Sequence, residues 1–173
     1  KRMKDMQNKI KDALLQIILI IPYIISSIFV FYAVKSNENF MKIKLNNIKS
    51  SAEIDNFQFN FLIIIIIILS SIVTLFITYF LLKLIIFIFN RDSSHNGKDI
   101  FMSLLISYMI TNLVVIFYIN VLGASYESAK FVTPFADLII FTMLYYLNTK
   151  NSKNTILLFV AKAVIVILGM ILI

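Results

Sequence analysis

The sequence predicts an all-α protein, a polytopic transmembrane helical bundle of about five spans, and three observations lead to this prediction. The run 59–89 is almost wholly apolar and contains six consecutive isoleucines, Ile63 to Ile68. About 20 helical residues cross a hydrocarbon core of roughly 30 Å, so this run is long enough to span a bilayer. Apolar residues make up 60% of the chain, with a mean hydropathy of +0.92, whereas soluble domains hold about 45–50%. Four further apolar segments complete the pattern.

The expected spans share a single domain, residues 1–173, because a chain of this length has no room for a separate soluble module. The first span is interrupted by Pro22. The fourth has only about 16 residues, so a tilted full span and a re-entrant helix both remain open, and we favour the full span. In chain order, the expected spans are 13–34, 59–89, 100–122, 132–147 and 155–173.

The basic residues near the span ends predict that the N-terminus lies inside and the C-terminus outside. Nine of them fall on the inner side and five on the outer side with this orientation. The nine are Lys1, Arg2, Lys4, Lys9, Lys11, Arg91, Lys98, Lys150 and Lys153, and the five are Lys35, Lys42, Lys44, Lys49 and Lys130. The abundance of Ile, Lys and Asn indicates an AT-rich bacterial genome, so we expect a multi-pass protein of the bacterial cytoplasmic membrane. Since the chain begins with Lys instead of Met, we also expect that residues precede it.

The outer loop 35–58 separates the first two spans and allows three interpretations. Apolar residues alternate there with Lys42, Lys44 and Lys49. The spacing of Phe40 and Ile43 suits a short interfacial helix whose lysines lie beside lipid phosphates. The alternation over 41–45 suits a short strand. The interpretation we favour is an ordinary loop that folds back on the bundle.

Nothing in the sequence indicates an enzyme, a metal site or a cofactor. The chain has no cysteine, three glycines and one histidine, so thiolate sites and phosphate-binding glycine loops are excluded. His95 lies in the polar turn 91–98, and lipid chemistry would require it to assemble there with Asp92 and Asp99. The net charge of +7 comes largely from flanks that suit anionic lipid headgroups, so we expect no nucleic-acid partner.

Asp137 is the main candidate for a functional contact, because an ionisable group at membrane depth is costly. Its natural counter-ion is Lys162 in the fifth span. If the fourth span begins at Val132, Asp137 lies near the outer interface, and Lys162 is offset from it by on the order of 12 Å along the membrane normal. We therefore favour an Asp137 that caps a helix, snorkels outward or meets a partner chain over an internal ion pair.

The third span carries the most polar stripe of the chain. Ser103, Ser107 and Thr111 recur every four residues, so they share one helix face, with Asn112 and Tyr118 beyond them. We favour close helix packing, with interhelical hydrogen bonds worth about 0.6 kcal/mol each. The alternative is a substrate path along this face.

The layout resembles the Yip family of five-span membrane proteins, including its bacterial branch. The resemblance rests on the basic N-terminus, the Pro-containing first span, the long second span, and the segment Asn96-Gly97-Lys98-Asp99-Ile100-Phe101 that enters the third. The family's early proline in span three is replaced here by the Ser107-Tyr108 neighbourhood. Some bacterial members look like accessory subunits of ABC exporters that protect a cell from antimicrobial or self-made peptides.

The resemblance implies a non-enzymatic protein that works through partners. We expect an accessory or scaffold subunit of a membrane transport complex, with an ABC permease and ATPase as partners and bacteriocin immunity as the setting. The alternative is a small substrate-binding transporter subunit, or a homo-oligomeric channel, with its polar path along span three.

Overall fold

The computed structural model describes residues 2–90 and 97–171, with side chains described at position 14 and from 16 onward. It contains six helices, five of them long and apolar enough to cross a membrane. The described residues form no strand, which confirms the all-α transmembrane bundle. The helices are α1 (Arg2–Asn37), α2 (Asn39–Ser51), α3 (Asn56–Phe89), α4 (Gly97–Asn120), α5 (Tyr126–Thr149) and α6 (Ser152–Ile171).

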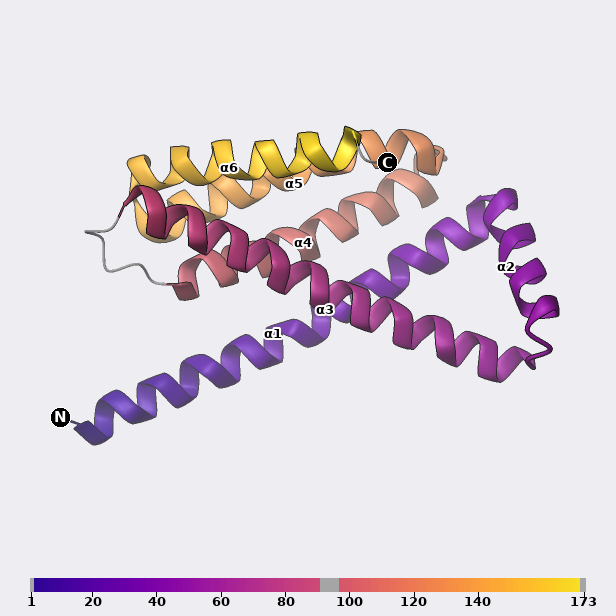
Figure 1. Ribbon diagram of the computed structural model, residues 1–173, viewed down its shortest axis with the longest axis horizontal. Helices are drawn as coiled ribbons and strands as arrows, with labels where there is room; N and C mark the ends of the chain where they lie inside the picture. The colour runs from indigo at the N-terminus through magenta and orange to yellow at the C-terminus, as the bar shows by residue number, and fades with distance from the viewer. Residues whose placement is uncertain (1, 91–96, 172–173) are drawn as a thin grey trace.

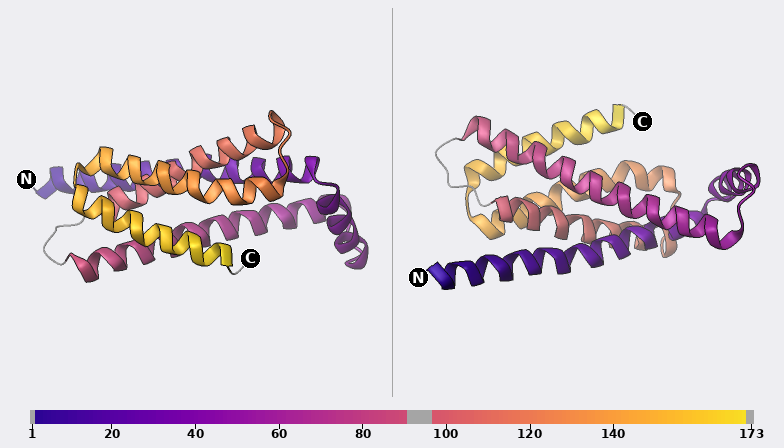
Figure 2. Two further views of the ribbon diagram at one scale, coloured as in Figure 1. Left: turned by 90° about the horizontal axis from the view of Figure 1, so that it is seen from above. Right: turned by 60° about the horizontal axis from the view of Figure 1, so that its bottom comes forward.

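The five long helices run back and forth between the two ends of the bundle (Figure 1). Helices α4, α5 and α6 lie side by side, whereas α1 and α3 cross each other obliquely and are joined by α2 at one end (Figures 1 and 2). The N-terminus and the C-terminus point toward opposite ends of the bundle, as five spans require.

Helix α5 begins six residues before the expected start of the fourth span, at Tyr126 instead of Val132. The Ser125 side chain caps it by accepting a hydrogen bond from the Ser128 N–H at 3.3 Å. Pro134 therefore lies inside the helix, where transmembrane helices tolerate proline. The resulting 24-residue helix is long enough for a full span.

Residues 39–51 of the expected outer loop are helical, so neither the strand nor the ordinary loop describes them. Just beyond the end of α2, Glu53 has a φ of 52°, a left-handed conformation that lets the chain turn toward α3. The Asp55 carboxylate then caps α3 by accepting a hydrogen bond from the Gln58 N–H at 2.8 Å.

The core lies where the five long helices meet, and Tyr23 of α1 belongs to it. Its fully buried apolar side chains include Leu75 and Leu82 of α3, Leu104 of α4, Phe141 of α5 and Leu158 of α6. A smaller cluster joins Val34, Val115, Ile119 and Ala129 near the α2 end.

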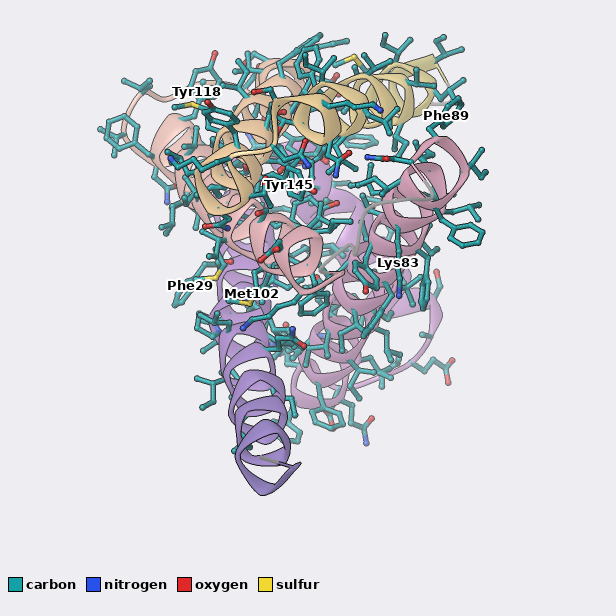
Figure 3. All side chains as sticks on the ribbon, turned by 90° about the vertical axis from the view of Figure 1, so that its left-hand side faces the viewer. Phe29, Lys83, Phe89, Met102, Tyr118 and Tyr145 are labelled. Atoms are coloured by element: carbon teal, nitrogen blue, oxygen red, sulfur yellow. The ribbon has the colours of Figure 1, made fainter. Side chains whose placement is uncertain are left out.

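The outer surface carries many large apolar side chains, as expected for helices that face lipid. Figure 3 looks along the bundle, with Phe29 and Phe89 projecting outward on opposite sides and Tyr145 directed inward. Together with the five apolar helices, this surface identifies a multi-pass membrane protein.

Candidate functional site

Asp137 of α5 and Lys162 of α6 form an ion pair inside the bundle. The Lys162 Nζ lies 2.9 Å from the Asp137 Oδ2. Only 2% of Lys162 and 8% of Asp137 is exposed. The Ser107 hydroxyl of α4 donates a hydrogen bond to the other carboxylate oxygen, Oδ1, at 2.5 Å. Three helices therefore contribute one polar side chain each to a single buried cluster.

The expectation that Asp137 caps a helix, snorkels outward or meets a partner chain is wrong, because the ion pair is internal. The error comes from the start of the helix. Asp137 lies eleven residues after Tyr126 in a 24-residue helix, and Lys162 lies ten residues after Ser152 in a 20-residue helix. Both residues are thus near the middle of their helices, at similar depth.

Two aromatic rings complete the surroundings of the Lys162 ammonium. Its Nζ lies 4.2 Å from the centroid of the Phe141 ring and 5.2 Å from that of Tyr108. The Nζ makes no hydrogen bond of good geometry within the described chain, so its close approach to Asp137 is an ion pair without a well-directed hydrogen bond. Cation–π contacts of a desolvated ammonium are worth about 2 kcal/mol, so the rings offset part of the cost of burying the charge.

A pair of tyrosines extends this cluster toward α1 and α3. The Tyr108 hydroxyl donates to the Thr78 Oγ1 at 3.1 Å, and the Tyr23 hydroxyl donates to the Ser71 carbonyl at 3.0 Å. The rings of Tyr23 and Tyr108 stack with centroids 5.7 Å apart. All five long helices therefore contribute to one connected interior of polar and aromatic side chains.

The other residues of the polar stripe on α4 are distributed among different contacts. Asn112 donates from its Nδ2 to the hydroxyls of Ser26 and Ser27 on α1, at 2.9 and 3.1 Å. Thr111 is buried, and its hydroxyl has no partner within the described chain. Tyr118 packs on the smaller apolar cluster, away from the ion pair.

Sequence reasoning placed Ser107, Asp137 and Lys162 among the candidates but missed Phe141, Tyr108 and Thr78. Tyr108 directly follows Ser107 in the sequence, yet a tyrosine in an apolar helix carries no signal of a cationic neighbour. Phe141 lies four residues after Asp137, so the two residues share a helix face. This spacing could have identified Phe141 as a neighbour of the ion pair.

The residues proposed for the interface lie on α2, at one end of the bundle and away from the ion pair (Figure 1). Phe40, Lys42 and Lys44 are exposed. Lys49 is half-buried, and its Nζ donates to the Asn56 Oδ1 at 2.5 Å. His95 and Asp92 lie outside the described residues.

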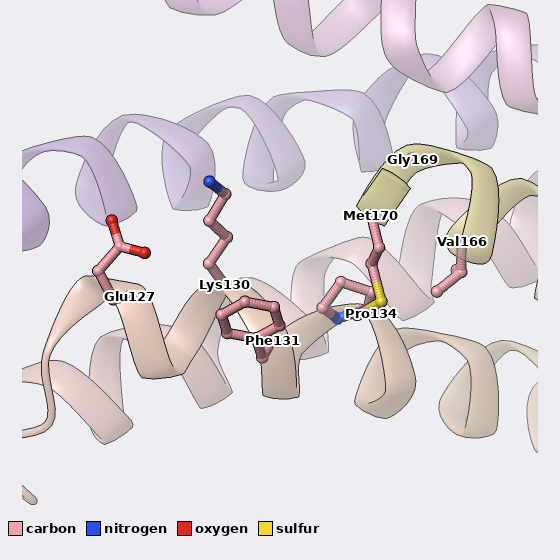
Figure 4. A pocket seen from close by; sticks show the side chains of 7 residues that line it. All are labelled: Glu127, Lys130, Phe131, Pro134, Val166, Gly169 and Met170. Carbon is pink, nitrogen blue, oxygen red and sulfur yellow. The ribbon is translucent and has the colours of Figure 1, made fainter. Parts of the chain in front are cut away.

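Three cavities on the described surface are bordered by residues other than Asp137 and Lys162. One of about 400 Å³ lies between the start of α5 and the end of α6, beside Phe131, Pro134 and Gly169 (Figure 4). Two of about 350 Å³ lie beside Tyr79 and beside Lys44. Within the described ranges, no group of three or more His, Asp or Glu residues could hold a metal ion.

Comparison of the chain with family models, curated proteins and solved structures finds no match. The resemblance to the Yip family therefore stays a prediction.

Proposed function

We propose that this chain is a non-enzymatic accessory or scaffold subunit of a membrane transport complex. The observation that supports this role is the buried polar cluster. Lys162 and Ser107 both bind the Asp137 carboxylate, so its charge is balanced inside the bundle. Such a cluster fixes how α4, α5 and α6 pack, because any other arrangement leaves a charge unpaired in the membrane.

A bundle with a fixed shape suits a protein that presents its outer surface to other membrane subunits. The exposed side chains of the long helices are mainly large and apolar, so they pack as readily against partner helices as against lipid tails. The proposed partners are the permease and ATPase of an ABC-type exporter, with antimicrobial-peptide export or immunity as the setting. This part of the proposal rests on the resemblance described above.

The test is a mild-detergent pull-down of the tagged chain from its native membranes, followed by mass spectrometry. We expect an ABC permease and an ATPase to be recovered at comparable amounts. An unrelated tagged five-span protein, expressed at the same level, is the control for non-specific recovery. Recovery of the chain alone, or of the same proteins with the control, would overturn the proposal.

One observation favours a second candidate, a small substrate-binding transporter subunit or oligomeric channel. Asp137 and Lys162 are ionisable residues at membrane depth, a feature typical of a substrate or ion path, and the nearby Thr111 hydroxyl is buried without a partner in the described chain. The distinguishing experiment is ion or solute flux through proteoliposomes that contain the purified chain. Flux that is lost in Lys162→Met favours this candidate, whereas absence of flux favours the scaffold.

We also propose that the N-terminus faces the cytoplasm, on the basis of the Lys and Arg distribution. The chain has no cysteine, so single cysteines introduced at Asn46 and at Lys153 can be labelled from one side of intact cells. We expect an impermeant maleimide to label position 46 but not 153. The reverse pattern would refute this orientation.

A further inference from the structure

Helix α2 lies across the ends of two transmembrane helices. It begins at Asn39, two residues after α1 ends at Asn37, and it is followed by α3 from Asn56. It runs across the direction of the long helices at one end of the bundle (Figures 1 and 2). Because α1 and α3 are both apolar spans, the connection between them falls where the hydrocarbon core gives way to lipid headgroups.

The outward side of α2 exposes three large apolar side chains among polar ones. The exposed fractions are 73% for Phe40, 60% for Ile43 and 50% for Ile48. Ile43 and Ile48 lie three and eight positions after Phe40, so they flank it on the two sides of a broad helix face. Exposing such a face to water is unfavourable, whereas burying it at the boundary of headgroups and acyl chains removes that cost.

The charge of α2 is positive and complements anionic headgroups. Lys42, Lys44 and Lys49 belong to the helix, and the segment 39–51 contains no acidic residue. Lys49 is engaged with Asn56, whereas Lys42 and Lys44 are exposed and have no ion pair within the part of the chain that the structure describes. The Lys44 Nζ lies 5.9 Å from the Phe40 ring centroid, so a positive charge stands directly beside the apolar face.

The bundle holds α2 in a defined orientation. The Glu38 carboxylate, just before α2, accepts a hydrogen bond from the Tyr126 N–H of α5 at 2.7 Å. Asn37 donates from its Nδ2 to the Asn120 Oδ1 at 2.9 Å. Met41 packs on the apolar cluster that contains Val34. The apolar face and its lysines are therefore fixed relative to the spans.

A cavity of about 350 Å³ lies between α2 and the start of α5, beside Lys44. Val34, Phe40 and Met41 form its apolar wall, and Glu38 and Glu127 also line it. The apolar wall suits the upper acyl chain of one phospholipid. Glu38 and Glu127 disfavour an anionic phosphate inside the cavity, so the phosphate contact is with Lys44 at its edge.

We propose that α2 is an interfacial helix that binds anionic phospholipid of the bilayer in which the chain sits. Phe40, Ile43 and Ile48 enter the upper acyl region, and Lys44 contacts the lipid phosphate. The proposal is independent of the scaffold role, because it concerns only the chain and its lipid.

The depth of α2 is tested with single cysteines at Ile48 and Asn46, labelled with an environment-sensitive fluorophore in nanodiscs of phosphatidylcholine and phosphatidylglycerol at about 3:1. The two positions are two residues apart, so they face nearly opposite sides of the helix. We expect the probe at 48 to be quenched by spin-labelled lipid and the probe at 46 by aqueous iodide. Equal quenching of both probes by iodide would show that α2 stands clear of the membrane and would overturn the proposal.

The lipid preference is tested by native mass spectrometry of the purified full chain titrated with phosphatidylglycerol or phosphatidylcholine. We expect phosphatidylglycerol to bind more tightly, and Lys44→Gln to weaken it about fivefold, equivalent to about 1 kcal/mol for one lysine at an anionic surface. Lys153→Gln, an exposed lysine at the opposite end of the bundle, is the matched control and should retain wild-type affinity. Equal affinity for the two lipids, or equal effects of the two substitutions, would overturn the proposal. Neither experiment depends on a partner protein, so its failure is distinguishable from failure of the scaffold role.

Discussion

Replacing Lys162 by methionine is expected to destabilise the bundle more than any other single change at the buried cluster. Methionine retains most of the length of the lysine side chain but removes the ammonium. The Asp137 carboxylate then loses the cation 2.9 Å away and keeps the Ser107 hydroxyl as its partner. A buried charge without its counter-ion is far less stable than the intact pair.

The magnitude follows from the contacts. Breaking one side of a buried ion pair costs about 3–5 kcal/mol, so we expect about 4 kcal/mol for Lys162→Met. Asp137→Asn should lower the free energy of unfolding by about 2 kcal/mol, which is less than for Lys162→Met. The Lys162 ammonium still contacts the rings of Phe141 and Tyr108, and these rings and the amide introduced at position 137 offset part of the loss. The double variant Asp137→Asn/Lys162→Met should be more stable than Lys162→Met alone, since it buries no unpaired charge.

The assay is the free energy of unfolding from reversible detergent titration of the purified chain, monitored by circular dichroism. Lys83→Met is the matched control, because Lys83 is an exposed lysine of α3 whose Nζ lies 5.6 Å from the Tyr79 ring. We expect that control to change stability by about 1 kcal/mol at most. If the two single substitutions at the ion pair simply add in the double variant, the two charges do not interact and the reasoning is refuted.

Three further predictions concern the contacts around the site. Asn112→Ala removes two hydrogen bonds to α1 and should cost about 1 kcal/mol in the same titration; no loss would mean that these bonds do not join the helices. Phe141→Leu removes the ring 4.2 Å from the ammonium and should cost about 2 kcal/mol, whereas Phe135→Leu, an exposed control, should have little effect; equal costs would contradict a cation–π role. Glu38→Gln removes the negative charge from the first N–H of α5 and should speed hydrogen–deuterium exchange across 39–51, with a loss of about 0.5 kcal/mol; unchanged exchange would show that Glu38 does not hold α2.

The bundle could be predicted from the sequence because lipid imposes one solution on long apolar segments. A chain in hydrocarbon must satisfy its own backbone, so runs such as 59–89 form helices whatever their neighbours are. The start of α5 was harder to predict from the sequence. The charged residues Glu127 and Lys130 lower the hydropathy of 126–131, and Pro134 is a residue typical of a first helical turn. The structure instead places the proline well inside the helix, after the Ser125 cap.

The position at which α5 starts determined whether the Asp137–Lys162 contact could be predicted. A helix that begins six residues earlier places a given residue about 9 Å deeper, which accounts for most of the separation that argued against the Asp137–Lys162 pair. Residue types alone had identified both partners correctly. Their contact required helix depth, which depends on a cap and a proline whose positions a hydropathy pattern does not resolve.

The helical conformation of α2 was underdetermined for a different reason. Apolar residues recur over 40–48 at spacings of both two and three, so strand and helix patterns compete. The contact that orients the segment joins Glu38 to Tyr126, positions 88 residues apart. No local pattern contains that information.

The length of α3 has a consequence for the membrane itself. Its 34 residues extend about 51 Å, whereas α6 with 20 residues extends about 30 Å, which matches a typical hydrocarbon core. One chain thus combines a helix that fits the bilayer with one that exceeds it, and the surplus is accommodated by tilt or by local thickening of the lipid. We therefore expect the protein to respond to bilayer thickness, with thin membranes increasing the inclination of α3 and thick membranes allowing it to stand more upright.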